Sequence, residues 1–303
     1  MHVMEASDTG LGIDAGGTQT RWALADAFGT IVAEGHVAGS SALQMASPAG
    51  RERLRATFEA LAAEVLAHGR PCRIMAGLTG FGGDSAVLTG WLSELLGVAP
   101  QEISLCNDIE IAFLDAFAPG GGYLVYAGTG SIAAFIDAAG TFHRAGGRGV
   151  VLDDAGGGFW IAREAMRRIW RREDEQPGAW QASPLAHAVF DHVGGSDWSF
   201  SRQFIYTRER GEIGQLALAV ARAADEDEEA REILRQAGAE LARLARALAA
   251  RFGPRPLVLS GRAAELHPLI AQAMRAALPA QPALEQRTAR PHAAAARLAI
   301  RPH

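Results

Sequence analysis

The segment Gly12-Ile13-Asp14-Ala15-Gly16-Gly17-Thr18-Gln19-Thr20 ends an apolar run in a glycine-rich turn. A similar segment, Val125-Tyr126-Ala127-Gly128-Thr129-Gly130-Ser131, follows later in the chain. After each turn come a second apolar strand, an aspartate, a Gly-Thr turn and a third strand. This duplicated order predicts two units that each begin with antiparallel strands joined by short turns.

The two glycine turns have the composition of phosphate-binding loops. Small residues leave backbone N–H groups accessible, and neighbouring Thr or Ser hydroxyls add donors, so such a turn can wrap an anionic phosphate. Either turn alone is better explained as an ordinary β-hairpin. The duplication, together with Asp14 at the end of the first strand, favours a clamp for a polyphosphate.

Size and charge narrow the function classes. The chain has 303 residues, of which 49% are hydrophobic, enough for two domains with a real core. Its net charge of −5 leaves no basic stripe, which argues against a nucleic-acid partner and favours a small substrate. Met1 to Gly10 lacks signal-peptide features and no stretch has the length of a membrane span, so we expect a cytoplasmic protein without membrane contact.

The first half of the chain predicts alternating strands and helices. Strands are expected within 11–38, at 73–78 and at 103–106, and helices at 48–68, 84–96 and 109–117. Ligands of such sheets gather at the carboxyl ends of the strands, where Asp14 and Asp108 both fall. Cys72 and Cys106, the only cysteines, lie in apolar runs and are expected to be reduced thiols, in neither a disulfide nor a zinc site.

The second half predicts a new domain from about residue 120. Three glycines precede a helix at 159–172, and residues 173–202 are expected to form a short helix and loops. Further helices are expected at 211–224, 226–252, 268–278 and 293–300, with a strand-turn junction at 256–262. The acidic run 225–229 is interpreted as the solvated first turn of a helix.

Five motifs occur in order: Asp-x-Gly-Gly-Thr, an Asn-Asp after a strand, Gly-Thr-Gly-Ser, Gly-Gly-x-Gly followed by Asp and glycines, and a late strand-Ser-Gly turn. In this order they resemble the BadF/BadG/BcrA/BcrD ATPase family of the actin-like ATPase superfamily, specifically its N-acetylglucosamine and glucosamine kinases. The resemblance spans Gly12 to Ala299 and is most specific at 128–131 and 146–165.

The resemblance implies an α/β fold with two ribonuclease-H-like domains and a central cleft that binds ATP and a sugar. The N-terminal domain would cover residues 1–119 and the C-terminal domain 120–303, with the helix at 293–300 packing back on the N-terminal domain. The implied reaction is transfer of the γ-phosphate of ATP to the 6-hydroxyl of N-acetyl-D-glucosamine or D-glucosamine. A homodimer is also expected.

The resemblance also assigns site residues. Asp108 matches the catalytic base and contacts the sugar, and Asp14 matches the acid that holds Mg²⁺ through water. The implied nucleotide contacts are Gly16, Gly17, Thr18, Gly128, Thr129, Gly130, Ser131, Gly211, Ser260 and Gly261. The implied sugar contacts are Asp108, Gly147, Arg148, Gly149 and Asp154.

These roles agree with the chemistry of phosphoryl transfer. A sugar hydroxyl is a poor nucleophile at neutral pH, so a carboxylate must orient it and accept its proton. Carboxylates beside a triphosphate imply a magnesium ion to neutralise the charge.

Three departures from the family pattern leave the acyl state of the sugar open. The family usually reads Gly-Asp-Glu-Gly-Ser-Gly where this chain has Asp153-Asp154-Ala155-Gly156-Gly157-Gly158. Many N-acetylglucosamine kinases carry Trp at the position of Arg148, whereas a basic residue there is similar to bacterial glucosamine kinases. The late turn has Arg262 in place of a second glycine.

Other interpretations stay open. On spacing alone, Asp14 and Asp108 are explained as acids that cap the next turn or helix, and Arg148 as an ion-pair partner of Asp153 or Asp154. The chain is also compatible with an ATPase that activates a radical dehydratase through an iron–sulfur cluster, although the cluster cysteines of that branch follow the second turn. A sugar-binding or ATP-binding regulator without turnover is the third alternative.

Overall fold

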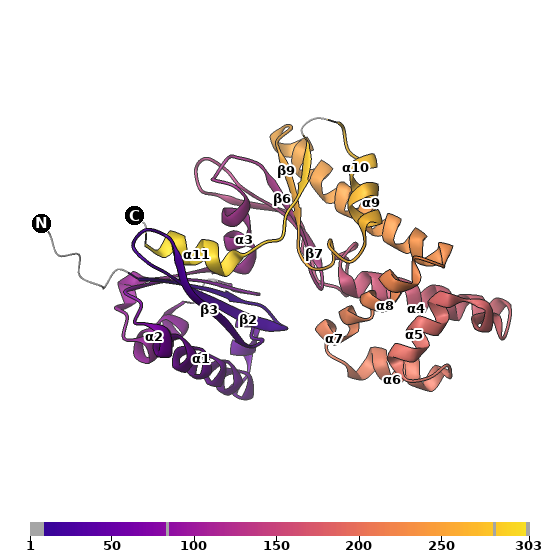
Figure 1. Cartoon of the computed structure of the whole chain (residues 1–303), viewed down its shortest axis with the longest axis horizontal. Helices are drawn as coiled ribbons and strands as arrows, with labels where there is room; N and C mark the ends of the chain where they lie inside the picture. Colours follow the sequence, from indigo (N-terminus) through magenta and orange to yellow (C-terminus); the bar gives the residue numbers. More distant parts are fainter. Residues whose placement is uncertain (1–8, 83–84, 281–282, 301–303) are drawn as a thin grey trace, which may run out of the picture. The chain divides into compact units, whose positions relative to one another are not determined.

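The computed structural model describes residues 9–82, 85–280 and 283–300 (Figure 1). These residues form two compact units, the first of 9–118 with 289–300 and the second of 119–288. The sequence-based division placed 120–303 in the second domain but expected the helix at 293–300 to pack on the first. The structure groups this helix with the first unit. The expected helix start at residue 84 and the first eight residues lie outside the described part.

The first unit is built on a mixed five-stranded sheet with the order β3-β2-β1-β4-β5. The strands are β1 Gly10–Ala15, β2 Gln19–Ala25, β3 Ile31–Ala38, β4 Arg73–Leu78 and β5 Ile103–Asn107. The first three form an antiparallel series, as the glycine turns predicted, while β4 and β5 run parallel to β1. The carboxyl ends of β1, β4 and β5 therefore lie at one edge of the sheet.

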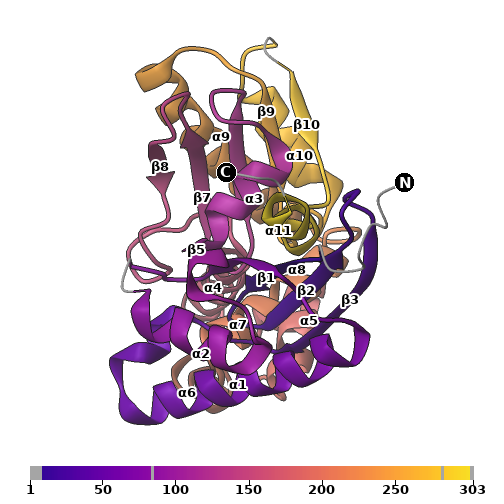
Figure 2. The ribbon, with the colours of Figure 1, turned by 90° about the vertical axis from the view of Figure 1, so that its left-hand side faces the viewer.

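Helices cover both faces of this sheet. The helices α1 Pro48–His68 and α2 Ala86–Leu96 lie on one face, and α3 Asp108–Ala116 and α11 Pro291–Ala299 on the other (Figure 2). Local sequence sets the ends: Ser47 caps α1 ahead of a proline, and Asn107 with Glu110 forms a capping box at α3. Helix α11 packs on β1, β2 and α3.

The second unit begins, like the first, with three antiparallel strands. Its sheet has the order β10-β9-β6-β7-β8. The strands are β6 Tyr123–Ala127, β7 Ser131–Ile136, β8 Phe142–Gly146, β9 Leu257–Ser260 and β10 Leu284–Gln286. The antiparallel series β6-β7-β8 confirms the predicted second copy, and the three-residue strand β10 was not expected because its sequence has no apolar alternation.

The two copies share their second turn in detail. Asp26 Oδ1 accepts from the N–H groups of residues 28 and 30, and Asp137 Oδ1 accepts from those of residues 139 and 141. Gly29 and Gly140 adopt nearly the same left-handed φ, 81° and 82°. The aspartate and the glycine that recur in the sequence are therefore the residues that shape this turn.

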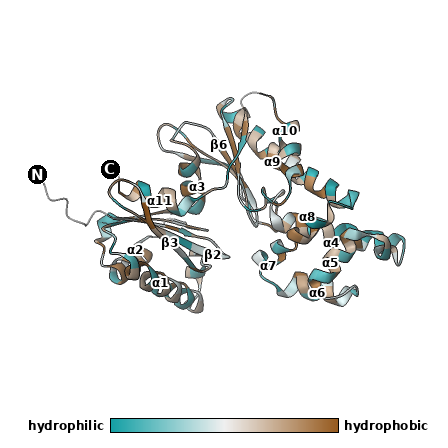
Figure 3. Ribbon diagram, in the orientation of Figure 1, coloured by the Kyte–Doolittle hydropathy of each residue, from teal (hydrophilic) through white to brown (hydrophobic). Residues whose placement is uncertain are grey.

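Helix α9 Glu228–Phe252 packs on β6, β7 and β8, and α10 Pro268–Ala276 packs on α9. In Figure 3, α9 alternates between hydrophobic and hydrophilic residues along its length. Its buried residues include Ile233, Leu234, Leu241, Leu244 and Leu248, which confirms the predicted apolar face.

Between β8 and α9 the chain is largely helical. The helices are α4 Gly158–Glu175, α5 Pro184–Val193, α6 Trp198–Thr207, α7 Arg210–Gln215 and α8 Ala217–Ala223. The expectation of loops within 173–202 was wrong, because Ser183 and Asp197 act as N-caps for two regular helices in this polar stretch. The single helix expected at 211–224 is divided at Leu216.

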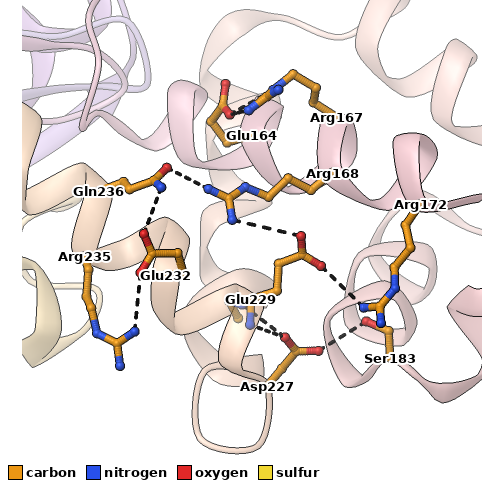
Figure 4. Close-up of polar contacts among 11 residues, drawn as sticks. Glu164, Arg167, Arg168, Arg172, Ser183, Asp227, Glu229, Glu232, Arg235 and Gln236 are labelled. Carbon is orange, nitrogen blue, oxygen red and sulfur yellow. Dashed lines mark hydrogen bonds and ion pairs between the residues drawn. The ribbon is translucent and has the colours of Figure 1, made fainter. Parts of the chain in front are cut away.

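A polar network joins α4, α5 and α9 (Figure 4). Glu229 pairs with Arg168 and Arg172 at 4.0 and 3.7 Å, and Asp227 Oδ2 accepts from Ser183 Oγ at 3.2 Å. Asp227 is buried and caps α9 through Glu229 N. The acidic run is thus only partly solvated, because Asp227 is buried and Glu229 pairs with two arginines of α4.

No helix among the described residues is long and apolar enough to cross a membrane.

Candidate functional site

The first glycine turn joins β1 to β2 and is braced from one side. Gly16 accepts a hydrogen bond from Ser40 N at 3.0 Å, and Ser40 Oγ lies 2.8 Å from Thr20 Oγ1 in a buried contact. Gly17 and Thr18 are exposed, and a Cβ built on Gly17 would meet no atom within 4 Å. The turn therefore presents small, accessible residues on a fixed support, as a phosphate loop requires.

Strand register brings the two predicted carboxylates to the same sheet edge. Asp14 pairs with Gly77 of β4, and Gly77 pairs with Cys106 of β5. Asp108 comes two residues after Cys106 in the chain. A side chain at residue 77 would overlap Ile111 and come within 3.0 Å of the Asp108 Cα. Glycine at this position lets α3, with Asp108 as its first residue, lie close against β4.

Asp108 is half-buried and both of its carboxylate oxygens are hydrogen-bonded. Thr79 Oγ1 donates to Oδ2 at 2.5 Å, and Ile109 N donates to Oδ1 at 2.9 Å. Burial raises the pKa of Asp108, and the two hydrogen bonds oppose this shift because they stabilise the charged form. A carboxylate whose pKa is raised toward the working pH is suited to accept a proton.

The residues at this edge of the sheet suit a hard cation whose other ligands are water and phosphate oxygens. Asp14 supplies a carboxylate beside the glycine turn, and Mg²⁺ bound with a nucleotide uses one or two carboxylates plus waters and phosphate oxygens. Within the described part of the chain, no three His, Cys, Asp or Glu side chains gather as a complete metal cage. The donor set therefore fits magnesium that is held through water and phosphate.

The second glycine turn joins β6 to β7 and rests on the N-terminus of α4. Gly158 N donates to Gly128 O at 2.8 Å, and Phe159 N donates to Thr129 O at 2.9 Å. Ser131 Oγ is buried and donates to Ala155 O at 2.7 Å. The Ser131 hydroxyl therefore supports the turn from within, and its contact with the nucleotide stays a prediction.

The residues expected on the nucleoside side lie on β9 and α7. Gly261 has a left-handed φ of 100°, and a Cβ there would overlap Ala127 O, so glycine is required where this turn meets β6. Ser260 Oγ donates to Arg287 O at 2.7 Å, and the contact of Ser260 with the nucleoside stays a prediction. Gly211 lies in α7, whose Gly214 lies beside Thr129.

Asp154 contacts both the predicted sugar-binding segment 147–149 and the second turn. It is the one described non-glycine residue with a positive φ, 51°. Its Oδ1 accepts from Gly149 N at 3.0 Å, and its Oδ2 lies against Gly130. Burial raises the pKa of Asp154, whereas the backbone N–H groups of Gly149 and Arg148 lower it. Gly147, another predicted sugar contact, donates its N–H to Ser131 O.

Arg148 is exposed, and its side chain forms no ion pair with any residue that the structure describes. Asp153 pairs instead with Arg243 at 3.2 Å, so the alternative that Arg148 is its partner is wrong. Two contributors to these sites were not predicted. Thr79 was assigned only to a loop, and Arg210 acts on Asp154 through its charge from α7.

Cys72 and Cys106 are both reduced, and Cys72 Sγ donates to Thr9 O at 3.3 Å. Cys106 Sγ lies 3.8 Å from Ala76 O, and burial raises the pKa of Cys106 to about 12. It is therefore protonated at neutral pH, which disfavours a role as a thiolate ligand.

The close packing between Gly130 and Asp154 gives a prediction. In Gly130→Ala the new Cβ would overlap Asp154 Oδ2 and lie 3.0 Å from its Cγ, so the carboxylate must leave Gly149 N. We expect ATP to bind about 10-fold more weakly, as for the loss of a charged hydrogen bond. Calorimetric titration with ATP checks this, and Gly90→Ala, which places its methyl in open space, is the control. Unchanged affinity in Gly130→Ala would contradict the prediction.

Comparison with known proteins places this geometry in a family. A solved structure from Chromobacterium violaceum, assigned as an N-acetylglucosamine kinase, is 28% identical, has a TM-score of 0.72, and aligns over 97% of this chain and 99% of that chain. One from Porphyromonas gingivalis with the same assignment is 16% identical with a TM-score of 0.69, over 94% and 96%. A ROK family glucokinase from Streptomyces griseus, solved with glucose and AMPPNP, is 16% identical with a TM-score of 0.61, over 96% and 98%.

The last two likenesses concern the fold alone, which is α/β as expected. No curated protein matches the chain at a significant level. The model of the BadF/BadG/BcrA/BcrD ATPase family matches residues 11–287, which is most of the chain. This protein therefore belongs to the BadF/BadG/BcrA/BcrD ATPase family.

Proposed function

We propose that this protein is an ATP-dependent hexosamine kinase, which phosphorylates the 6-hydroxyl of N-acetyl-D-glucosamine or D-glucosamine. The observation that carries the proposal is Asp108, a half-buried carboxylate with a raised pKa at the sheet edge that also presents Asp14 and the turn 16–18. The 28% identity to the protein assigned as an N-acetylglucosamine kinase, over nearly the full length of both chains, supports the amino-sugar class.

In the proposed reaction, Asp108 accepts the proton of the sugar hydroxyl as that oxygen attacks the γ-phosphorus. Its ionised form is needed, and the hydrogen bonds from Thr79 and Ile109 keep that form accessible despite burial. Phosphoryl transfer depends mainly on positioning the reacting groups and on neutralising charge. The base must therefore be held in a fixed place, as Asp108 is at the first turn of α3. When bound, Mg²⁺ near Asp14 would neutralise the phosphate oxygens.

The other assigned residues divide between the two substrates. We propose that Gly16, Gly17 and Thr18 hold phosphate groups through their backbone, together with the turn Gly128–Thr129–Gly130, whose carbonyls are already anchored on α4. Arg148 and Asp154 would recognise the sugar. The exposed guanidinium of Arg148 is available for a substrate oxygen because Asp153 is paired elsewhere.

A substrate panel tests the function. With ATP and Mg²⁺, we expect ADP release to require an amino sugar, and kcat/KM for glucose to be at least about 10-fold lower than for the better of glucosamine and N-acetylglucosamine. A coupled ADP assay with these three sugars and N-acetylmannosamine measures this. Equal ADP release with and without sugar would show an ATPase and not a kinase.

A further inference from the structure

Thr79 joins three segments of the first unit at the end of β4. Its hydroxyl donates to Asp108 Oδ2 at 2.5 Å, and its N–H donates to Ala15 O at 3.0 Å. Its carbonyl accepts from Ser41 Oγ at 2.9 Å and from Ala42 N at 3.0 Å. All polar atoms of this one residue are therefore hydrogen-bonded: one to the predicted base, one to the residue before the first turn, and one to residues 41–42.

These bonds fix the base relative to the first turn. Ala15 is the last residue of β1 and directly precedes Gly16, so the Thr79 backbone is tied to the start of the turn. The Thr79 side chain is tied to the carboxylate on α3. A threonine hydroxyl has one hydrogen to donate, and in Thr79 it forms the hydrogen bond to Asp108.

The geometry of the carboxylate leaves room for a substrate. An ionised carboxylate offers roughly four lone-pair positions, and Thr79 and Ile109 each occupy one, on different oxygens. Two donors from separate elements prevent rotation of the carboxylate about its Cβ–Cγ bond. The remaining lone pairs are thereby held in fixed directions for a hydroxyl that approaches from outside.

We propose that Thr79 is a positioning residue for phosphoryl transfer, whose hydroxyl holds the Asp108 carboxylate in the orientation that accepts the proton of the sugar hydroxyl. The inference rests on the proposed function, since it needs a sugar hydroxyl as the acceptor. Thr79 contacts neither substrate in this scheme and acts only through Asp108.

Thr79→Val separates this role from a structural one. Valine keeps the branched shape, and the backbone bonds to Ala15, Ser41 and Ala42 do not involve the hydroxyl. We expect kcat to fall by about 10- to 100-fold, as for a lost hydrogen bond to a charged group. The KM for ATP and the calorimetric affinity for ATP should stay within about two-fold of the wild type.

The pH profile gives a second readout. Loss of the donor removes support for the ionised carboxylate, so the acid limb of kcat/KM should move to higher pH. The other ionisable groups on α3 and on the elements packed around it are Glu110 and Asp115 on α3, Arg73 on β4, Cys106 on β5, Asp14 on β1, and Arg290, His292 and Arg297 at and within α11. None of them is altered by the substitution, so the shift reports on Asp108.

Thr79→Ser restores the hydroxyl and should keep kcat within about three-fold of the wild type and the acid limb in place. Thr57→Val is the matched control, because Thr57 on α1 bonds only its own helix at Arg53 O. Thr79→Ala provides a second variant without the hydroxyl if valine lowers the melting temperature.

Three outcomes would overturn the inference. Wild-type kcat and an unmoved acid limb in Thr79→Val, with Asp108→Ala inactive, would remove the positioning role and leave the kinase proposal intact. Equal damage in Thr79→Ser and Thr79→Val would show that volume and not the hydroxyl matters. A wild-type protein inactive on every amino sugar would overturn the proposed function, and the inference with it.

Discussion

Asp108→Asn is expected to lower kcat for amino-sugar phosphorylation by about 10²- to 10⁴-fold, the usual contribution of a positioned general base. Asparagine keeps the shape and can accept the bond from Ile109 through its one amide oxygen, while its NH2 group faces the Thr79 hydroxyl as a donor. Its amide cannot take the hydroxyl proton. The affinity for ATP should change little, because the base acts on the sugar. Steady-state rates with a coupled ADP assay and calorimetry with ATP measure the two quantities.

The control for this substitution is Asp191→Asn on the exposed side of α5, which should leave kcat unchanged. If Asp108→Asn kept more than a tenth of the wild-type kcat, Asp108 would be a helix-capping acid and not the base. That is the alternative that its place at the first turn of α3 permits.

The same variant has a predicted effect on stability that separates lost chemistry from misfolding. The pKa of Asp108 is raised by burial, so the native state binds its proton more tightly than the unfolded chain does. Its contribution to stability is therefore largest at low pH and is lost as pH rises from the unfolded pKa through the raised native pKa. At neutral pH, Asp108→Asn should melt at a higher temperature than the wild type, and this gain should shrink on acidification.

Short sequence patterns predicted the parts of the fold that are determined by contacts between neighbouring residues. The recurrence of Asp26 and Asp137 before Gly-Thr reflects a turn that each aspartate builds with its own neighbours. Asp14 and Asp108 were placed correctly at strand ends, because an apolar run followed by a polar residue marks that position.

Contacts between distant segments were not predictable from such patterns. Thr79 reaches Asp108 only because β4 and β5 pair in a register that aligns Leu78 with Asn107. The hydroxyls of Ser131 and Ser260 resemble ligand donors in sequence, but the folded chain brings carbonyl acceptors to both. The last helix was expected to pack on the first unit, but no local pattern indicated that it would contact β1, β2 and α3.

The packing of α11 on β1 supports the second large prediction, which concerns Gly12. A Cβ at this position would overlap two backbone atoms of the helix, His292 O and Ala296 N. Backbone atoms cannot rotate away as a side chain does, so in Gly12→Ala the helix must move off the sheet. We expect a loss of at least about 3 kcal/mol in the free energy of unfolding, at the upper end for overpacking of a core.

Gly90→Ala is the matched comparison within the same unit. Gly90 lies in α2 with no atom within 4 Å of its would-be Cβ, so alanine there should stabilise the unit by about 0.5–1 kcal/mol. Urea denaturation followed by circular dichroism measures both variants. Because Asp14 lies on the strand that carries Gly12, displacement of α11 should also weaken ATP binding, whereas Gly90→Ala should not. Equal stability of the two variants would mean that α11 does not lie on β1 as described.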